Sequence, residues 1–214
     1  VKKWDFYGET FSVGEGVLIP RPETEMLVDM AKERLKGTDT PFIVEVGTGT
    51  GAISIACAKE IAGAIVLATD ISEDALSLAR ENAAACGLEG VVKFAVADGL
   101  DEVDPESVDV IVSNPPYIKT AVIEGLMAEV REFEPRMALD GKEDGLYFYR
   151  RICEEAKAFL VPGGRLMFEI GHDQGETVPE LLQKAGYEAV EVKQDYAGLD
   201  RMVFAVWPGD NKEI

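Results

Sequence analysis

Asn114, Pro115, Pro116 and Tyr117 are the residues of this chain whose types and spacing are best suited to chemistry. An amide nitrogen is a poor nucleophile, so an enzyme that modifies it must orient the NH₂ group and stabilise the developing positive charge. The Asn114 side-chain oxygen and the Pro115 carbonyl are suitable hydrogen-bond acceptors for that group. The prolines fix φ and carry no N–H, so the loop cannot continue as a helix that would use the carbonyl. Tyr117 can lay its ring against a flat amide or base, and we expect the loop to be catalytic rather than an ordinary turn.

A glycine-rich segment, Glu45-Val46-Gly47-Thr48-Gly49-Thr50-Gly51, lies where an apolar strand pattern changes to a helical one. Glycines at such a turn let a ligand approach the backbone, and the start of the helix offers free amides. The motif alone leaves alternatives open. Gly47, Gly49 and Ala52 also have the spacing of NAD-binding loops, and a turn without any ligand would look the same.

Acidic residues near the glycines favour S-adenosylmethionine as the ligand. Glu45 directly precedes them, and its charge suits a cationic ligand better than the pyrophosphate of a dinucleotide. Asp70 ends the next predicted strand, where its carboxylate can accept hydrogen bonds from both hydroxyls of a ribose. Asp98 ends the strand after that and can accept from the exocyclic amine of an adenine, although a turn-capping role also suits an Asp there.

The strands that position these residues belong to a predicted α/β fold, because short apolar patterns alternate with longer helical ones from residue 42 onward. Strands are expected at 42–46, 65–69, 91–97, 108–112, 165–170, 188–193 and 202–207, and helices at 52–61, 72–86, 146–160 and 177–185. The last two strands are joined by a segment too short for a crossover helix, so they should be antiparallel. We predict a doubly wound, mostly parallel seven-stranded sheet with one antiparallel strand near its edge.

The N-terminal region is expected to form a small β-hairpin over 6–19 and an amphipathic helix over 23–35. We therefore divide the chain into an N-terminal hairpin and helix, residues 1–36, and a cofactor-binding domain, residues 37–214. The first residue is Val1 rather than Met, and we expect the chain to be part of a longer protein.

The composition narrows the classes of partner. Forty acidic residues against 21 basic ones give a formal net charge of −19, which disfavours binding to the phosphates of nucleic acid. No apolar stretch is long enough to span a membrane, and no signal-peptide core follows Val1. Cys57, Cys86 and Cys153 are expected to be free thiols, which indicates a cytoplasmic protein. His172 is the only histidine and has no Cys nearby, so we expect no metal site.

Taken together, these segments resemble the release factor glutamine methyltransferase family over nearly the whole chain. The resemblance is carried by Leu18-Ile19-Pro20-Arg21-Pro22-Glu23-Thr24-Glu25, Asn114-Pro115-Pro116-Tyr117-Ile118, Glu134-Pro135-Arg136-Met137-Ala138-Leu139, Asp144-Gly145-Leu146, Glu169-Ile170-Gly171 and Asp200-Arg201. Several amino-methylating families share a Pro-Pro-Tyr loop, but the first and third segments are much more specific.

The resemblance implies transfer of a methyl group from S-adenosyl-L-methionine to the glutamine of a Gly-Gly-Gln loop in peptide chain release factors, with S-adenosyl-L-homocysteine as the product. It implies a set of cofactor-binding residues, namely Glu45, Gly47, Thr48, Gly49, Thr50, Gly51, Asp70, Ile71, Asp98, Gly99 and Asn114. It also implies that residues 114–117 hold the glutamine and that Arg21 and Glu23 shape the substrate entrance, although Pro22-Glu23 also suits a plain helix start.

The chain departs from the family pattern in two places. The family usually has an N-terminal helical domain that helps to hold the release factor, and the given sequence shows no counterpart, which we expect to affect docking rather than chemistry. Lys142 stands where the family often has glycine.

Other functions remain as alternatives. A ribosomal-protein glutamine methyltransferase is a close relative, and an adenine-N6 methyltransferase uses the same loop on a flipped base but needs a basic cleft. A non-catalytic scaffold would not need every motif intact, and an NAD-dependent enzyme would leave the Asn-Pro-Pro-Tyr loop unexplained.

Overall fold

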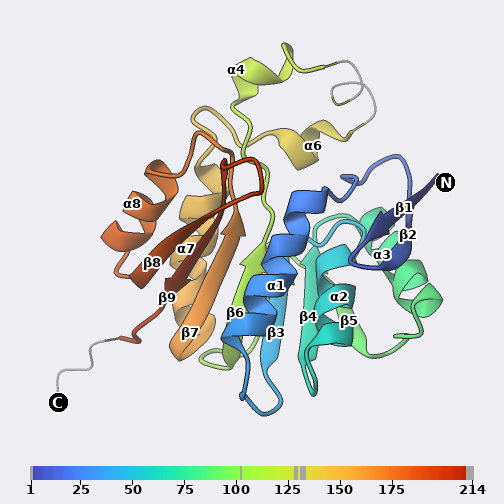
Figure 1. Ribbon diagram of the computed structural model, residues 1–214, viewed down its shortest axis with the longest axis horizontal. Helices are drawn as coiled ribbons and strands as arrows, with labels where there is room; N and C mark the ends of the chain where they lie inside the picture. Colours follow the sequence, from blue (N-terminus) through green and yellow to red (C-terminus); the bar gives the residue numbers. More distant parts are fainter. Residues whose placement is uncertain (1, 102, 128–129, 131–133, 211–214) are drawn as a thin grey trace.

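A computed structural model describes residues 2–101, 103–127, 130 and 134–210 of the chain. Its centre is a seven-stranded sheet with helices on both faces (Figure 1). The strands are β3 Phe42–Val46, β4 Ile65–Asp70, β5 Val92–Val96, β6 Val108–Ser113, β7 Leu160–Glu169, β8 Glu188–Gln194 and β9 Asp200–Val206. Their order across the sheet is β5-β4-β3-β6-β7-β9-β8.

The sheet confirms the predicted fold class. Strands β3 to β7 pair in parallel, whereas β9 is antiparallel to both of its neighbours, β7 and β8. The reversal follows from the short turn between β8 and β9, where Asp195 Oδ1 accepts hydrogen bonds from the amides of Ala197 and Leu199. β7 begins at Leu160, earlier than the expected 165, because Gly163 and Gly164 hydrogen-bond to Trp207 beyond the end of β9.

Alternating apolar residues give the central strands two buried faces. Ile43, Val110 and Met167 face one hydrophobic cluster, and their neighbours Val44, Ile111 and Phe168 face the other. Helices α1 Glu25–Arg34, α2 Ala52–Glu60 and α3 Glu73–Ala85 contribute to the first cluster, and α7 Tyr147–Phe159 and α8 Thr177–Lys184 to the second. Within the residues that the structure describes, no helix is long and apolar enough to cross a membrane.

The N-terminal hairpin lies earlier in the chain than the sequence pattern suggests. Its strands are β1 Lys2–Phe6 and β2 Glu9–Val13, not residues 6–19, and Tyr7 and Gly8 form the turn with positive φ values of 49° and 77°. β1 is mostly exposed, and its apolar alternation is limited to Trp4 and Phe6, which is too short a pattern for periodicity to reveal the strand. The predicted helix over 23–35 divides into a short 3-10 turn, η1 Pro22–Thr24, and α1.

Residues 2–36 share a core with the sheet. Phe6 and Phe11 pack edge to face and belong to the same hydrophobic cluster as Leu27, Ile43 and Ile55. After β2 the chain runs over the carboxyl ends of the strands before it enters η1. Two short helices, α4 Thr120–Ile123 and α6 Arg136–Leu139, lie above the same end of the sheet (Figure 1).

Candidate active site

A cavity opens at the carboxyl ends of β3, β4, β5 and β6, where ligands bind in open α/β sheets. Most of the residues predicted for cofactor and substrate line it, namely Glu45, Gly47, Thr48, Gly49, Thr50, Asp70, Ile71, Asp98, Gly99, Asn114, Pro115 and Pro116. Gly51, Tyr117, Arg21 and Glu23 do not. Gly51 has a packing position instead, because a Cβ on it would lie 3.0 Å from the Ala79 Cβ of α3.

The glycine loop leaves room for a ligand. Gly47 and Gly49 have φ values of 75° and 55°, and a Cβ added to either would meet nothing within 4 Å. The loop is fixed from the strand side, where the amides of Gly47 and Thr48 donate to the Thr69 carbonyl. The backbone therefore has the exposed cradle that the sequence motif predicts.

Glu45 is buried beneath this loop and joins it to α2. Its Oε2 accepts hydrogen bonds from Thr48 Oγ1 at 2.7 Å, from the Ser54 amide at 3.0 Å and from Ser54 Oγ. Burial raises the pKa of the Glu45 carboxyl to about 7, against the three hydrogen bonds that lower it. Glu45 thus braces the loop and brings a titratable carboxyl to the cavity wall.

Asp70 ends β4 and also supports the loop. Its Oδ2 accepts from the Gly49 amide at 2.9 Å, and its Oδ1 accepts from the Ser72 amide at 2.9 Å. Each carboxylate oxygen has a second lone pair. The side chain can therefore stay fixed by the backbone while it accepts hydrogen bonds from a ligand.

Asp98 has an ion-pair partner that the sequence did not reveal. Arg151 of α7 donates from Nη1 to Asp98 Oδ1 at 2.6 Å and from Nη2 to the Asp98 carbonyl at 3.0 Å. Its Nε donates to Glu155 Oε1 at 2.7 Å, and these two acidic partners raise the pKa of the guanidinium. In the sequence, Arg151 and Glu155 resemble any surface ion pair at i and i+4 on a helix.

The charge of the cavity indicates the class of its ligand. Glu45, Asp70, Asp98 and Glu155 line it, and among the described residues Arg151 is the one cation in its lining. A ligand with anionic phosphates would be repelled there, whereas one with an ammonium and a sulfonium would be attracted. The residues present therefore fit S-adenosylmethionine and fit a dinucleotide poorly.

The loop Asn114–Tyr117, here called the acceptor loop, follows β6 and lies beside the glycine loop. Ser113 Oγ donates to the Val46 carbonyl at 2.7 Å, which ties the two loops together. Across the described parts of the chain, neither the Asn114 side chain nor the Pro115 carbonyl hydrogen-bonds to another protein group. Both acceptors therefore remain free to bind an NH₂ group at the cavity.

Tyr117 anchors the far end of this loop outside the cavity. Its hydroxyl donates to Glu169 Oε1 at 3.4 Å, and its carbonyl accepts from Gln174 Nε2 at 3.3 Å. Burial, together with the charge of Glu169, raises the Tyr117 pKa, so the hydroxyl stays protonated. The sequence predicts that the Tyr117 ring lies against the ligand, and the structure places Tyr117 outside the cavity lining with its hydroxyl on Glu169.

Arg21 lies at the rim and forms an ion pair with Glu134, whose side chain is 4% exposed. Glu134 Oε2 has no hydrogen-bond partner within the described residues. Glu23 is half-buried next to Thr24, a cavity-lining residue that the sequence analysis did not select. The Arg21–Glu134 pair joins the N-terminal segment to the segment that leads into α6.

The turn that contains Lys142 packs under the acceptor loop. Lys142 has a φ of 71°, a left-handed conformation that glycine adopts without strain. Its carbonyl accepts from the Thr120 amide at 2.9 Å, and the neighbouring Gly141 amide donates to the Ile118 carbonyl at 2.8 Å. The backbone at this position therefore has the shape expected where related sequences have glycine.

Comparison with known proteins gives consistent matches. The Methyltransferase small domain family matches residues 22–131. A release factor glutamine methyltransferase from Clostridium acetobutylicum is 41% identical over 97% of this chain and 74% of its own length. One from Bacillus cereus is 47% identical over 94% of this chain and 72% of its own length.

Solved structures agree with the fold. A release factor-specific protein-(glutamine-N5) methyltransferase from Alicyclobacillus acidocaldarius has a TM-score of 0.54 and 29% identity, covering 92% of this chain and 98% of its own. A methyltransferase from Pyrococcus furiosus has a TM-score of 0.65 and 22% identity, covering 94% and 89% of the two chains, which supports the fold alone.

Proposed function

The chain belongs to the release factor glutamine methyltransferase family, and on that basis we propose that it methylates the side-chain amide of a glutamine in a peptide chain release factor. One observation carries the proposal. A single cavity joins an acid-lined glycine loop to two unpaired acceptors, the Asn114 side chain and the Pro115 carbonyl. An enzyme that brings a cationic methyl donor to a neutral amide needs both.

The glycine-loop side would hold the cofactor. S-adenosylmethionine, when bound, supplies an electrophilic methyl group on a sulfonium, and S-adenosylhomocysteine is the product. We assign the binding residues as the loop from Gly47 to Gly51 with Glu45, Asp70, Ile71, Asp98, Gly99 and Asn114. The carboxylate of Asp70 suits the ribose hydroxyls, and Asp98, fixed by Arg151, suits the adenine amine.

The acceptor side would orient the glutamine. The Asn114 oxygen and the Pro115 carbonyl accept from the two hydrogens of the amide NH₂, so its nitrogen is aimed and the developing positive charge is stabilised. Pro116 keeps the loop open and Tyr117 anchors it. The proton can leave after transfer, so no general base is required beforehand.

Arg21 and Glu23 are proposed to shape the entrance for the protein substrate. Both lie on the N-terminal segment outside the cavity, and the ion pair of Arg21 with Glu134 supports a place at its rim. Residues 1–36 and 37–214, the two parts proposed from the sequence, would then both contribute to substrate binding.

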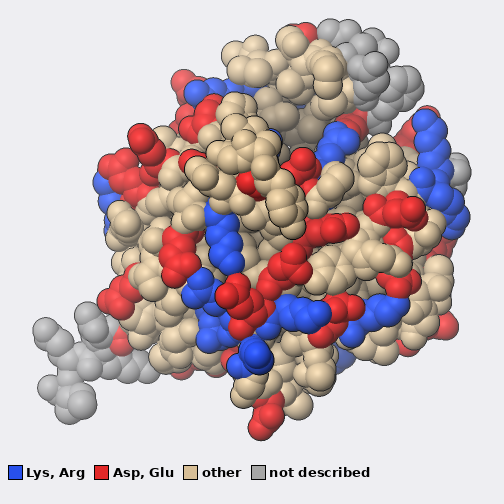
Figure 2. Space-filling view, in the orientation of Figure 1, with Lys and Arg blue, Asp and Glu red and all other residues tan. Residues whose placement is uncertain are grey.

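A protein substrate fits the surface better than nucleic acid does. On the face shown in Figure 2, Lys and Arg lie among Asp and Glu. Several Lys and Arg side chains of the described residues are in ion pairs, such as Arg34 with Glu191 and Lys193 with Glu33. Nucleic acid requires a continuous basic surface. The three free cysteines support a cytoplasmic location, where release factors act.

A methyl-transfer assay tests the proposal. Labelled S-adenosylmethionine is supplied with a release factor, with the same factor in which the Gly-Gly-Gln glutamine is alanine, with ribosomal proteins and with duplex DNA. We expect label only on the unaltered release factor. Label on ribosomal protein would favour the related glutamine methyltransferase, and label on DNA would refute the proposal.

A further inference from the structure

We propose that Glu169 is a positioning residue for methyl transfer, which holds the acceptor loop and the N-terminal segment in register through Tyr117 and Thr24. The inference rests on the proposed function for its kinetic test, although its geometric basis is independent of that function. Nothing in the glycine loop or the free acceptors of Asn114 and Pro115 requires a carboxylate at this position.

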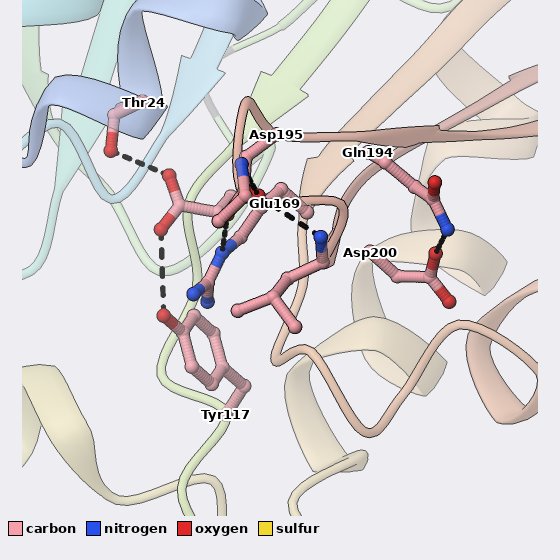
Figure 3. A network of polar contacts seen from close by, with 9 residues as sticks. Thr24, Tyr117, Glu169, Gln194, Asp195 and Asp200 are labelled. Carbon is pink, nitrogen blue, oxygen red and sulfur yellow. Dashed lines mark hydrogen bonds and ion pairs between the residues drawn. The ribbon is translucent and has the colours of Figure 1, made fainter.

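The geometry centres on one buried carboxylate at the end of β7. Glu169 is 3% exposed. Its Oε2 accepts from Thr24 Oγ1 at 2.5 Å and its Oε1 accepts from the Tyr117 hydroxyl at 3.4 Å. Figure 3 shows the two contacts leaving opposite oxygens of the same side chain, toward η1 and toward the acceptor loop. Thr24 itself lines the cavity.

A second set of contacts fixes the other end of Tyr117. Gln174 Nε2 donates to the Tyr117 carbonyl at 3.3 Å and to the Gly145 carbonyl at 3.1 Å, while its Oε1 accepts from the Gly171 amide at 2.9 Å. The Tyr149 hydroxyl donates to the Glu169 carbonyl at 2.8 Å, which holds the backbone of Glu169 itself. The end of β7 and the segment after it therefore hold Tyr117 at its hydroxyl and at its carbonyl.

The contacts of Tyr117 with Glu169 and Gln174, here called the Tyr117 anchor, affect the reaction because Tyr117 is three residues from Asn114. A loop that moves by an ångström misaligns the amide acceptors, and such misplacement costs on the order of 100-fold in rate. Thr24, the other partner of Glu169, lines the cavity itself. One carboxylate thus couples the acceptor loop to a wall of the cavity formed by a distant part of the chain.

The two contacts together, with Thr24 and Tyr117 both donating, require the ionised form of Glu169. Both Thr24 and Tyr117 donate, and a carboxylate is an acceptor only, whereas a protonated carboxyl must donate from one oxygen. Burial raises the pKa of Glu169 to about 7, with a smaller increase from Glu23, against the lowering effect of Arg201 and of the hydrogen bonds from Thr24 and Tyr117. Tyr149 also faces it and stays protonated. The anchor should therefore weaken as the pH falls below 7.

The kinetic test compares wild type, Glu169→Gln, Tyr117→Phe and the double variant at saturating cofactor. We expect each single variant to lose about 10- to 100-fold in kcat with little change in cofactor affinity. The double variant should lose no more than the worse single one, because both changes break the same contact. Asp109→Asn is the matched control, since its carboxylate holds the Phe42 amide at the opposite end of the sheet.

The pH profile separates positioning from structural support. Wild-type kcat should fall about tenfold from pH 8 to pH 6, in step with protonation of Glu169, whereas both single variants should lose this step. Glu45 titrates in the same range in every variant, so the ratio of variant to wild type isolates Glu169. Additive losses in the double variant would overturn the inference. A pH profile of Tyr117→Phe that keeps the wild-type fall in kcat at acidic pH would overturn it even if Glu169→Gln did not fold.

A measurement without turnover keeps the inference separate from the proposed function. In protein labelled with fluorotyrosine, the fluorine resonance of Tyr117, assigned with Tyr117→Phe, should shift with a midpoint near pH 7 in wild type and not in Glu169→Gln. A resonance that ignores pH contradicts the inference whether or not a release factor is methylated. A normal shift without methyl transfer contradicts the proposed function alone.

Discussion

Two buried carboxylates hold the two halves of the cavity, and they do so in different ways. Glu45 binds partners that are close to it in the sequence, since Thr48 and Ser54 are three and nine residues away. Glu169 joins partners 52 and 145 residues away, Tyr117 and Thr24. Both carboxyls are fully buried at strands of the same sheet, and burial raises the pKa of each to about 7.

The difference indicates how the two halves behave. The half around Glu45 is one strand–loop–helix unit whose shape is determined locally. The half around Glu169 exists only when η1, the acceptor loop, the end of β7 and the segment that carries Gln174 are all in place. We call the half around Glu169 the acceptor half and the half around Glu45 the cofactor half. Local opening should reach the acceptor half first, because its contacts connect separate elements of the fold.

The largest expected effect comes from breaking the acceptor half alone. Asn114→Ala removes one preorganised acceptor and should lower kcat by about 10²–10³, or about 3–4 kcal/mol of transition-state stabilisation. Cofactor affinity should change little, because the glycine loop, Asp70 and Asp98 remain. Turnover on a release factor and calorimetry with S-adenosylhomocysteine measure the two quantities. Wild-type turnover would refute the proposed role of Asn114.

Asn114→Asp sharpens the same experiment. The carboxylate keeps an acceptor and tolerates positive charge, so activity should survive if charge alone matters. We expect a loss close to that of Asn114→Ala, because the NH₂ group of Asn114 also helps to orient the substrate amide and is lost in the variant. Near-normal kcat in this variant would show that electrostatics dominates.

The converse variant breaks the cofactor half. Asp70→Ala removes a charged acceptor and the support for the Gly49 amide, so cofactor affinity should fall by about 1–3 kcal/mol. At saturating cofactor, kcat should recover most of its wild-type value, since the acceptor loop is intact. Calorimetry and a cofactor titration of the rate check both statements. A kcat loss as large as that of Asn114→Ala would mean that the halves are not separable.

The sequence predicts the local half of the site much better than the distant half. Glu45, the glycines and Asp70 are readable because strand, loop and helix follow one another along the chain. Arg151 and Gln174 are not, because helical or turn patterns place them far from the cavity until the sheet forms. The sequence identifies Tyr117 as a site residue, but its contact with Glu169 exists only once β7 packs beside β6. The hairpin over 2–13 was misplaced for a similar reason, since its burial depends on α3 and the sheet.

The pH dependence of stability compares the two carboxyls directly. Their folded-state pKa values of about 7 lie above the ordinary value of 4.5, so the folded protein binds more protons between those limits. Stability should therefore fall as the pH rises from 5 to 7 and level off above 7, by on the order of 1–3 kcal/mol for each group. Urea unfolding of wild type, Glu45→Gln and Glu169→Gln should show the slope reduced in each variant. Equal slopes in all three would contradict the assigned pKa values.

The smallest effect concerns the turn under the acceptor loop. Lys142→Gly relieves a left-handed backbone and should stabilise the protein by up to about 1 kcal/mol. Thr40→Gly is the matched control, because Thr40 has a φ of 47° but precedes β3, away from the acceptor loop. Both changes should raise stability in urea unfolding, and only Lys142→Gly should alter kcat. A kcat change in the control instead would break the link to the acceptor loop.

The most direct test is to locate the transferred methyl group. Release factor incubated with the protein and S-adenosylmethionine is digested and sequenced by tandem mass spectrometry, beside a reaction with Asn114→Ala. We expect one methyl group on the side-chain amide nitrogen of the Gly-Gly-Gln glutamine, nearly absent with the variant. A methyl group on a different residue, or equal labelling by Asn114→Ala, would contradict the proposed chemistry.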